Sequence, residues 1–406
     1  MQEQPFLLGV NYWPRRKAMY WWTDFDAGEV REEFALIREI GLEVVRLFLL
    51  WEDWQPAPDV VDHKALDHLE QVCDIAAGLG LRLNVTFFTG HMSGPSWTPA
   101  WMLQPDQPMP PRIWQVVSGG RAVNCGYRNP FTDPQALRAA ELQLQTVVGR
   151  LKEHPAIEVW NLGNEPDLFA WPADAAGGRA WTQRMTSLIR AIDPGHPVTC
   201  GLHVASLLVD NGLRVNDLFD EVDIPVMHGY PLYADWSNGP LDSDFVPFLC
   251  ALTSALCGKP ALMEEFGGCT APPGQASFVD EWQRYGQPFR QFMASEEDLA
   301  AYIEAVLPKL VEVGALGAMI WCYADYIPGL YVRPPCDQAW HERFFGLVRP
   351  DGSLKPHAEV IKRFAATRPA VQPARRRVAL DLSPEEYYRD PRRHAIRLYR
   401  AFTGGQ

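Results

Sequence analysis

Two motifs place glutamates where paired carboxyl groups could combine acid–base and nucleophilic chemistry. Asn161-Leu-Gly-Asn-Glu-Pro166 and Met263-Glu-Glu-Phe-Gly267 each end a short apolar run typical of a buried strand. If both runs belong to one parallel sheet, their carboxyl ends meet at the same edge. A retaining glycosidase needs such a pair, one proton donor and one nucleophile, with carboxyl groups about 5–5.5 Å apart. A single glutamate at a strand end more often forms a structural salt bridge at the rim. Two such glutamates with a buried arginine nearby are harder to explain by a purely structural role.

Residues at other expected strand ends could complete this site. Arg46 is a charge inside the apolar run Val44–Leu50, and a buried charge needs a partner. His228 and Tyr230 are two residues apart on one strand, so their side chains point the same way. His91 follows the run Leu81–Phe88; a loop histidine bonded to backbone is the alternative interpretation. The candidate substrate-binding residues are Arg46, His91, Asn164, His228, Tyr230 and Trp321.

Alternating strand and helix patterns must position these side chains, and the sequence predicts eight of each. Such a count is typical of an α/β protein with a (β/α)8 TIM barrel, whose active site lies at the carboxyl ends of the strands. The predicted strands are Phe6–Tyr12, Val44–Leu50, Leu81–Phe88, Ile157–Leu162, Pro197–Leu202, Val222–His228, Pro260–Phe266 and Leu316–Cys322. The predicted helices are Ala27–Ile40, His63–Gly80, Pro134–His154, Ala180–Ile192, Val215–Phe219, Val246–Leu256, Leu299–Val313 and Lys355–Ala365.

Long loops are expected to decorate the barrel, and a short arm to follow it. We predict a catalytic barrel over residues 1–366 and a C-terminal arm over residues 367–406, packed on the barrel through Tyr387, Tyr388 and Leu398-Tyr399. The four long loops after strands are Trp13–Asp26, Gly90–Asp133, Gly267–Glu297 and Tyr323–Ser353. Eight of their aromatic residues are expected to wall a pocket: Trp21, Trp22, Trp97, Trp101, Trp282, Tyr326, Tyr331 and Trp340.

The chain resembles a clan A glycoside hydrolase of family 5, on its β-mannosidase and β-mannanase side. The resemblance runs from about residue 6 to 366. It is carried by Arg46, Asn164-Glu165-Pro166, His228-x-Tyr230, Glu265-Phe-Gly267 and Trp321. It implies that Glu165 is the acid/base and Glu265 the nucleophile. Because side chains alternate across a strand, only one of Glu264 and Glu265 is expected to face the barrel interior, and the motif favours Glu265.

These roles carry physical expectations. The nucleophile must be ionised, so Arg46 and Tyr230 are expected to lower the pKa of Glu265. The acid must hold its proton, so burial and the neighbouring carboxylate are expected to raise the pKa of Glu165. Asn164 is placed to bond the 2-hydroxyl of the sugar, and Trp321 offers it a stacking surface.

Composition excludes several other functions. With 37 Lys and Arg against 50 Asp and Glu, the net charge of −13 argues against nucleic acid or an anionic membrane as partner. Eight scattered cysteines without a C-x-x-C motif indicate reduced thiols. Met1–Pro5 is polar and Phe6–Val10 too short for a signal-peptide core, so a cytoplasmic location is expected. No metal motif or phosphate loop is found, so no metal or cofactor is expected.

The sequence thus predicts a retaining β-glycosidase that acts on manno-oligosaccharides from one end. An endo-β-1,4-mannanase is one alternative. A β-glucosidase or β-galactosidase is another, since Gly9-Val-Asn-Tyr-Trp-Pro14 resembles the start of family 42 β-galactosidases. A barrel that only binds carbohydrate is a distant third, because both glutamates are present. The sequence leaves open the sugar, the linkage and the oligomeric state.

Overall fold

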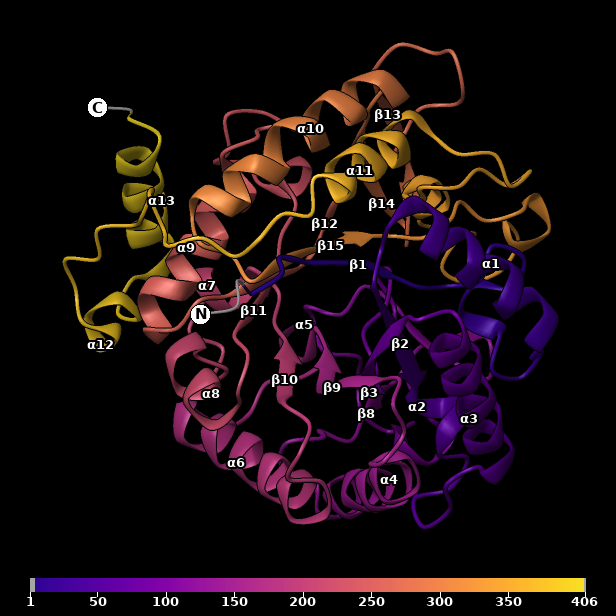
Figure 1. Cartoon of the computed structure of the whole chain (residues 1–406). Helices are drawn as coiled ribbons and strands as arrows, with labels where there is room; N and C mark the ends of the chain where they lie inside the picture. The colour runs from indigo at the N-terminus through magenta and orange to yellow at the C-terminus, as the bar shows by residue number, and fades with distance from the viewer. Residues whose placement is uncertain (1–3, 405–406) are drawn as a thin grey trace.

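A computed structural model describes residues 4–404 and shows one eight-stranded parallel barrel ringed by helices (Figure 1). The strands are hydrogen-bonded in the order β10-β9-β3-β2-β1-β15-β12-β11. Two backbone bonds close the ring, from His228 to Leu202 and from Val204 to His228. The barrel strands are β1 (Leu7–Asn11), β2 (Val44–Leu50), β3 (Arg82–Thr89), β9 (Ile157–Asn164), β10 (Val198–Gly201), β11 (Val226–His228), β12 (Leu262–Gly267) and β15 (Gly317–Trp321).

A helix of at least seven residues follows each barrel strand, so the predicted (β/α)8 barrel is confirmed. Local signals fix the helix ends: the Asp26 carboxylate caps the first turn of α1, and Gly41 ends that helix in the left-handed conformation. These helices are α1 (Ala27–Ile40), α3 (His63–Gly78), α4 (Pro134–Leu151), α6 (Ala175–Ile192), α8 (Val215–Glu221), α9 (Phe245–Cys257), α10 (Glu296–Glu312) and α11 (Pro356–Ala366).

The long loops contain short elements that the sequence did not predict. Single-turn helices follow three barrel strands: α2 (Trp51–Trp54), α5 (Pro166–Phe169) and α7 (Ala205–Leu208). The loop after β3 holds β4 (Ser96–Trp97), β5 (Leu103–Gln104), β6 (Val116–Ser118), β7 (Arg121–Val123) and β8 (Gly126–Tyr127). The loop after β12 forms an antiparallel hairpin of β13 (Phe278–Arg284) and β14 (Gln287–Met293). Short 3-10 turns lie at Ala18–Tyr20, Ala100–Met102, Pro231–Tyr233, Pro328–Leu330 and Trp340–Phe344.

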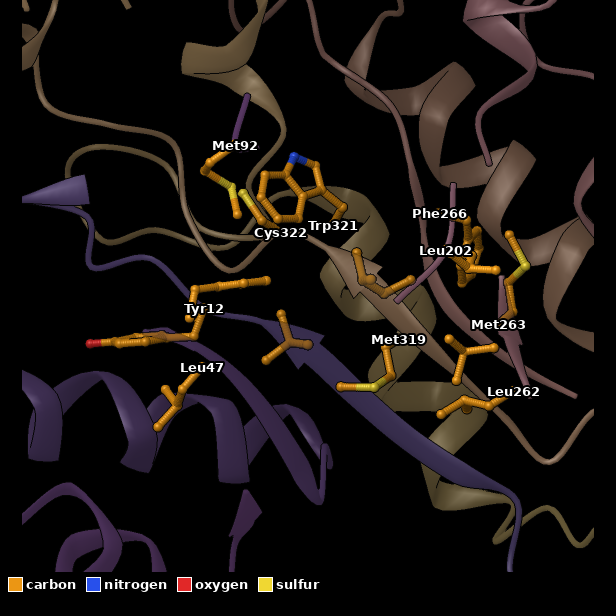
Figure 2. Packing of buried hydrophobic residues seen from close by; sticks show 14 of the residues in the cluster. Tyr12, Leu47, Met92, Leu202, Leu262, Met263, Phe266, Met319, Trp321 and Cys322 are labelled. Atoms are coloured by element: carbon orange, nitrogen blue, oxygen red, sulfur yellow. The ribbon is translucent and has the colours of Figure 1, made fainter. Parts of the chain in front are cut away.

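Apolar side chains fill the barrel interior beneath the polar groups at the carboxyl ends of the strands. Met319 of β15 lies against β1 at Gly9, where a Cβ atom would come within 2.8 Å of its methyl carbon. Figure 2 shows Met319 and Trp321 projecting from β15, with Leu262, Met263 and Phe266 of β12 nearby. Both strands are buried along their whole length, as expected for strands covered on two faces. This packing gives the polar side chains at the strand ends a rigid base.

The C-terminal segment forms two further helices, α12 (Pro384–Tyr387) and α13 (Pro391–Phe402). Helix α13 packs against α7 and α9 on the outside of the barrel (Figure 1). Tyr387, Tyr388, Leu398 and Tyr399 are all buried. The first three residues of the predicted N-terminal stretch and the last two of the predicted arm lie outside the described residues.

Two further findings concern sulfur and membranes. All eight cysteines belong to the described part of the chain, and each is a free thiol. Among residues 4–404, no helix combines the length and apolarity needed to cross a bilayer.

Candidate active site at the mouth of the barrel

The structure brings all eight predicted site residues together at the carboxyl ends of the strands. Arg46 and His228 are fully buried and contact the glutamates from inside the barrel. The other six line a cavity of about 430 Å³: His91, Asn164, Glu165, Tyr230, Glu265 and Trp321.

Glu165 begins the turn after β9, in a backbone conformation that few side chains adopt. Its φ of 46° and ψ of 52° are left-handed, which costs a non-glycine residue about 1–2 kcal/mol. Such strain is concentrated at functional sites, where the surrounding structure enforces it. The side chain enters the cavity, and one of its oxygens lies within 4.8 Å of a Glu265 oxygen.

Glu265 is held by donors on both carboxylate oxygens. Arg46 donates from Nη1 to Oε1 at 2.5 Å, and the Tyr230 hydroxyl donates to Oε2 at 2.9 Å. Both bonds favour the ionised carboxylate. This is the arrangement expected around a nucleophile.

Glu264 also points into the barrel, so the prediction that only one of the two glutamates faces inward is wrong. The pairing of β12 shifts on both sides here: Met227 pairs with Met263 and His228 with Glu265, and on β15 the shift falls between Met263 and Phe266. One extra residue is thereby inserted, a β-bulge that breaks strict alternation. Glu264 is fully buried, and its oxygens lie 2.7 Å from Asn84 Nδ2 and 3.0 Å from His228 Nε2.

Arg46 connects these groups at the centre of the barrel. Its guanidinium donates to Glu265, to Asn164 Oδ1 at 3.0 Å and to Asn11 Oδ1 at 3.1 Å, and it lies 3.5 Å from Glu264. Room for it requires glycine at position 201, where a Cβ atom would lie 2.5 Å from Arg46 Nη2. One buried cation therefore faces two buried carboxylates.

The pKa shifts of the two candidate catalytic glutamates are opposite to the prediction. Burial alone would raise the pKa of Glu165, but the facing imidazoles of His203, His228 and His91 lower it to about 2. Burial raises the pKa of Glu265, and the charge of Glu165 adds to this although His228, Arg46 and Tyr230 oppose it. The prediction rested on the donors around Glu265 and did not include the imidazoles around Glu165.

The charge on these imidazoles determines where the proton of the pair resides. Burial lowers the pKa of His91 to about 4 and lowers that of His203 as well, so both rings are neutral at neutral pH. Burial would also lower the pKa of His228, but Glu265, Glu165 and Glu264 raise it to about 9. At neutral pH the positive charge opposing protonation of Glu165 is therefore that of His228, which also faces Glu265.

Asn164 and His91 form the wall beside Glu165. Asn164 accepts from Arg46 through Oδ1 and donates through Nδ2 to the His91 carbonyl at 3.0 Å, which fixes the amide orientation. His91 Nε2 lies 3.7 Å from Glu165 Oε2, whereas its Nδ1 has no partner among the described residues. Trp321 ends β15 and lines the same cavity. His91 is therefore part of the cavity wall and not only a loop histidine bonded to backbone.

Aromatic residues do line the cavity, but they are not the ones that were predicted. None of the eight loop aromatics named from the sequence lines the cavity; Trp21, Trp22, Trp97 and Tyr326 are instead buried in the core. Large indoles pack against one another, as Trp21 and Trp22 do with ring centroids 3.9 Å apart. The aromatic residues that line the cavity are Trp114, Trp171, Tyr230, Tyr233, Phe289, Trp321 and Phe345.

Several functional candidates were missed by the sequence analysis. His203 follows β10 and lines the cavity. The strand-end rule, by which polar residues just after barrel strands are site candidates, would have found it in Cys200-Gly-Leu-His203. Arg284 and Glu342 reach the cavity from long loops and carry no motif. Partial burial raises the pKa of Glu342 to about 7.

The spacing of Glu165, His228 and Glu265 would also suit a metal ion, since one ligand atom from each lies within 4.8 Å of the others. However, Arg46 and Tyr230 already occupy both oxygens of Glu265. A guanidinium 2.5 Å from a carboxylate repels a second cation there. The donor set therefore fits an organic substrate better than a metal.

Comparison with known proteins agrees with this geometry. The family model for the TIM barrel domain of family 2 glycosyl hydrolases matches residues 113–302, and the β-galactosidase model of glycosyl hydrolase family 42 matches residues 19–173. A probable mannan endo-1,4-β-mannosidase F from Aspergillus flavus is 27% identical over 154 residues, which cover 34% of this chain and 32% of that protein. The chain thus spans about a third of the length of this curated relative.

Solved structures extend the similarity over the whole barrel. Exo-β-1,4-mannosidase Op5Man5 from Opitutaceae bacterium strain TAV5 is 26% identical with a TM-score of 0.72, covering 89% of this chain and 59% of that one. A GH5_18 protein from Streptomyces cattleya, solved with GlcNAc, shares the fold with a TM-score of 0.79 at 21% identity, covering 99% and 91%. These matches confirm the glycosidase-type barrel and the resemblance to family 5 mannosidases and mannanases.

Proposed function

We propose that this protein is a retaining β-glycoside hydrolase that acts on β-mannosides. The observation that carries the proposal is the pair Glu165 and Glu265, whose nearest carboxylate oxygens lie within 4.8 Å of one another in one cavity. This separation supports a covalent mechanism, because an inverting pair needs room for a water molecule, at about 6.5–9.5 Å.

The reaction would proceed in two displacements. Glu265 attacks the anomeric carbon while Glu165 gives its proton to the departing oxygen, so a glycosyl ester forms and the glycosidic bond breaks. Glu165, now ionised, takes a proton from water as the water attacks the anomeric carbon and releases Glu265. Tyr230 and Arg46 hold the attacking carboxylate in place, and Trp321 presents its ring to the sugar.

Mannosides are the leading substrates because the Aspergillus flavus relative and the Opitutaceae structure are named as mannosidases. β-Galactosides are the second candidate, since a family 42 model and a β-galactosidase from Arthrobacter, 27% identical over 169 residues, also match. Initial rates on nitrophenyl β-mannoside, β-glucoside and β-galactoside decide between them. A β-galactoside rate that exceeds the β-mannoside rate would contradict the mannoside assignment.

The loops around the cavity support attack from the chain end of the substrate. Arg284 of the hairpin lies over the rings of Phe289 and Trp114, at 4.1 and 5.2 Å from their centroids. Because Trp114 belongs to the loop after β3, this contact joins two loops over the barrel mouth. Arg284 Nε and His341 Nδ1 are buried in the cavity wall without a partner in the described part of the chain. Loops that meet over the mouth would limit how far a chain extends through the cavity, which favours binding of a chain end.

We expect mannose to be the first product from manno-oligosaccharides, with the viscosity of mannan almost unchanged. Loss of the loop contact in Arg284→Met is expected to raise KM about tenfold, as the loss of about 1–2 kcal/mol would. Arg290→Met is the matched control, because Arg290 is on the same hairpin but exposed and paired with Glu281. Product analysis over time checks the first expectation. Early mannobiose and mannotriose with a rapid viscosity drop would show an open groove instead.

We also expect the first-formed sugar to keep the β configuration. Two successive inversions at the anomeric carbon, one by Glu265 and one by water, restore the starting configuration. Proton NMR of a reaction followed within minutes of mixing measures the anomer before mutarotation. An α product would contradict the covalent mechanism while leaving glycosidase activity in place.

We further propose that the protein works in the cytoplasm, on oligosaccharides that have been imported. The eight free thiols support this location, since stable disulfides are typical of oxidising compartments. Fractionation of the native cells, followed by activity measurement, tests it.

A further inference from the structure

Glu264 is a third carboxylate of the site, and amide and guanidinium donors surround its side chain. Asn84 Nδ2 and Asn161 Nδ2 lie 2.7 and 2.9 Å from Oε1. The Asn161 orientation is fixed, because its Oδ1 accepts the backbone N–H groups of Gly163 and Gly201. Arg46 Nη2 lies 3.5 Å from Oε2 and has no acceptor to offer. The pocket is therefore built for an ionised carboxylate.

This environment fixes one proton of His228. Its Nε2 lies 3.0 Å from Glu264 Oε2, so an ionised Glu264 requires a hydrogen on Nε2. Imidazole and carboxylate are both fully buried. The alternative of a neutral pair, with the proton on Glu264, would leave the buried Arg46 cation facing an uncharged carboxylic acid at that position. Only Nδ1 of His228 is then able to gain or lose a proton.

The free nitrogen lies between the two candidate catalytic glutamates. Nδ1 of His228 is 3.1 Å from Glu165 Oε1 and 3.4 Å from Glu265 Oε1. When both glutamates are ionised, a proton on Nδ1 satisfies them. When this proton passes to Glu165, the His228 imidazolium becomes a neutral imidazole. Glu165 becomes the carboxylic acid that donates its proton in the first displacement.

We propose that Glu264 is a positioning residue that fixes the Nε2 proton of His228, so that Nδ1 holds the proton which Glu165 delivers to the leaving group. This inference rests on the proposed function for its kinetic part. It goes beyond the two-carboxylate mechanism because it adds a buried third carboxylate, acting through an imidazole, that sets how tightly the shared proton is held.

The charged and titratable groups that face His228 together determine how removal of Glu264 changes the hold on the shared proton. These groups are Arg46 on β2, Glu165 after β9, His203 after β10, Tyr230 after β11, and Glu264 and Glu265 on β12. Arg46 is permanently positive, and burial keeps His203 neutral and Tyr230 protonated at neutral pH. Removing the negative charge of Glu264 therefore weakens the hold of His228 on the shared proton.

The test is the pH dependence of kcat/KM in Glu264→Gln. We expect kcat/KM to fall about 100-fold and the basic limb to move down by about one pH unit or more. The same substitution in a His228→Gln background is expected to give no further shift, because the imidazole through which Glu264 acts is absent. An unchanged basic limb, or an equal shift in both backgrounds, would overturn the proposal.

A matched control separates this effect from loss of a buried carboxylate in general. Glu33 is also buried and accepts from the Tyr12 hydroxyl and the Arg15 backbone N–H, but it lies outside the cavity lining. Glu33→Gln is therefore expected to leave the pH profile in place, whatever its effect on stability.

Nitrogen-15 NMR of the unmodified protein provides a readout that needs neither a variant nor activity. The His228 ring is expected to carry hydrogen on Nε2 throughout pH 5–8, and an unprotonated Nε2 in that range would overturn the proposal. If no glycoside is hydrolysed, the kinetic measurement has no signal and the proposed function fails. The NMR result still decides the role of Glu264.

Discussion

Glu265→Ala is expected to lose activity by a factor on the order of 10⁵–10⁶, the scale seen when a covalent nucleophile is removed. Among the carboxylates of residues 4–404 that line the cavity, only Glu265 has its two oxygens bonded to a guanidinium and a phenol, those of Arg46 and Tyr230. Glu165→Ala is expected to lose about 10³–10⁴-fold on substrates whose leaving group needs a proton. Both residues lie at the rim, so circular dichroism should show an intact fold.

Azide distinguishes the two roles. It can enter the space left in Glu265→Ala and attack directly, giving a glycosyl azide of inverted configuration. In Glu165→Ala it intercepts the glycosyl ester formed on Glu265, giving retained configuration. Glu52→Ala, at the same rim but outside the cavity lining, is the control and should keep full activity. Identical azides from both site variants would refute the assignment of roles.

The fold was predictable because its signals are local and repeated. Helix Ala27–Ile40 and strand Val44–Leu50 agree with the structure residue for residue, since a capping aspartate, a terminal glycine and a run that is apolar except for Arg46 mark them. The hairpin β13–β14 was missed because one face is exposed and its pattern is broken by charge. Its two-residue turn, Tyr285-Gly286 with both φ values positive, was the available signal.

The site was predictable only as far as the strand-end rule reaches. That rule found the eight residues that converge, because parallel strands of a barrel end at one rim. It failed at Glu264, where a bulge that depends on the pairing of β12 with β11 and β15 turns a second carboxylate inward. It also failed for the pKa order of Glu165 and Glu265, which depends on the charged imidazole of His228 between them. Such effects arise from tertiary packing and are invisible to local patterns.

Arg46→Met is expected to cause the largest loss of stability among the site variants. Arg46 is fully buried and faces Glu264 and Glu265, at 3.5 and 2.5 Å. Removing one partner of a buried charge cluster leaves the others uncompensated and costs about 3–5 kcal/mol. Urea unfolding at pH 7 measures it. Arg150→Met is the control, because the exposed pair of Arg150 with Glu70 is expected to contribute no more than about 1 kcal/mol.

The penalty for Arg46→Met should also depend on pH, with a sign that identifies its cause. Without the guanidinium, burial raises the folded-state pKa of the two carboxyl groups above the unfolded value of about 4.3. A carboxyl group whose pKa is raised in the folded state costs no stability below its unfolded pKa. It destabilises the fold increasingly as the pH rises toward and through its folded pKa. The penalty should therefore shrink between pH 7 and pH 4, and adding Glu264→Gln should recover part of it at pH 7. An equal loss at both pH values would mean that Arg46 acts through packing and not through charge.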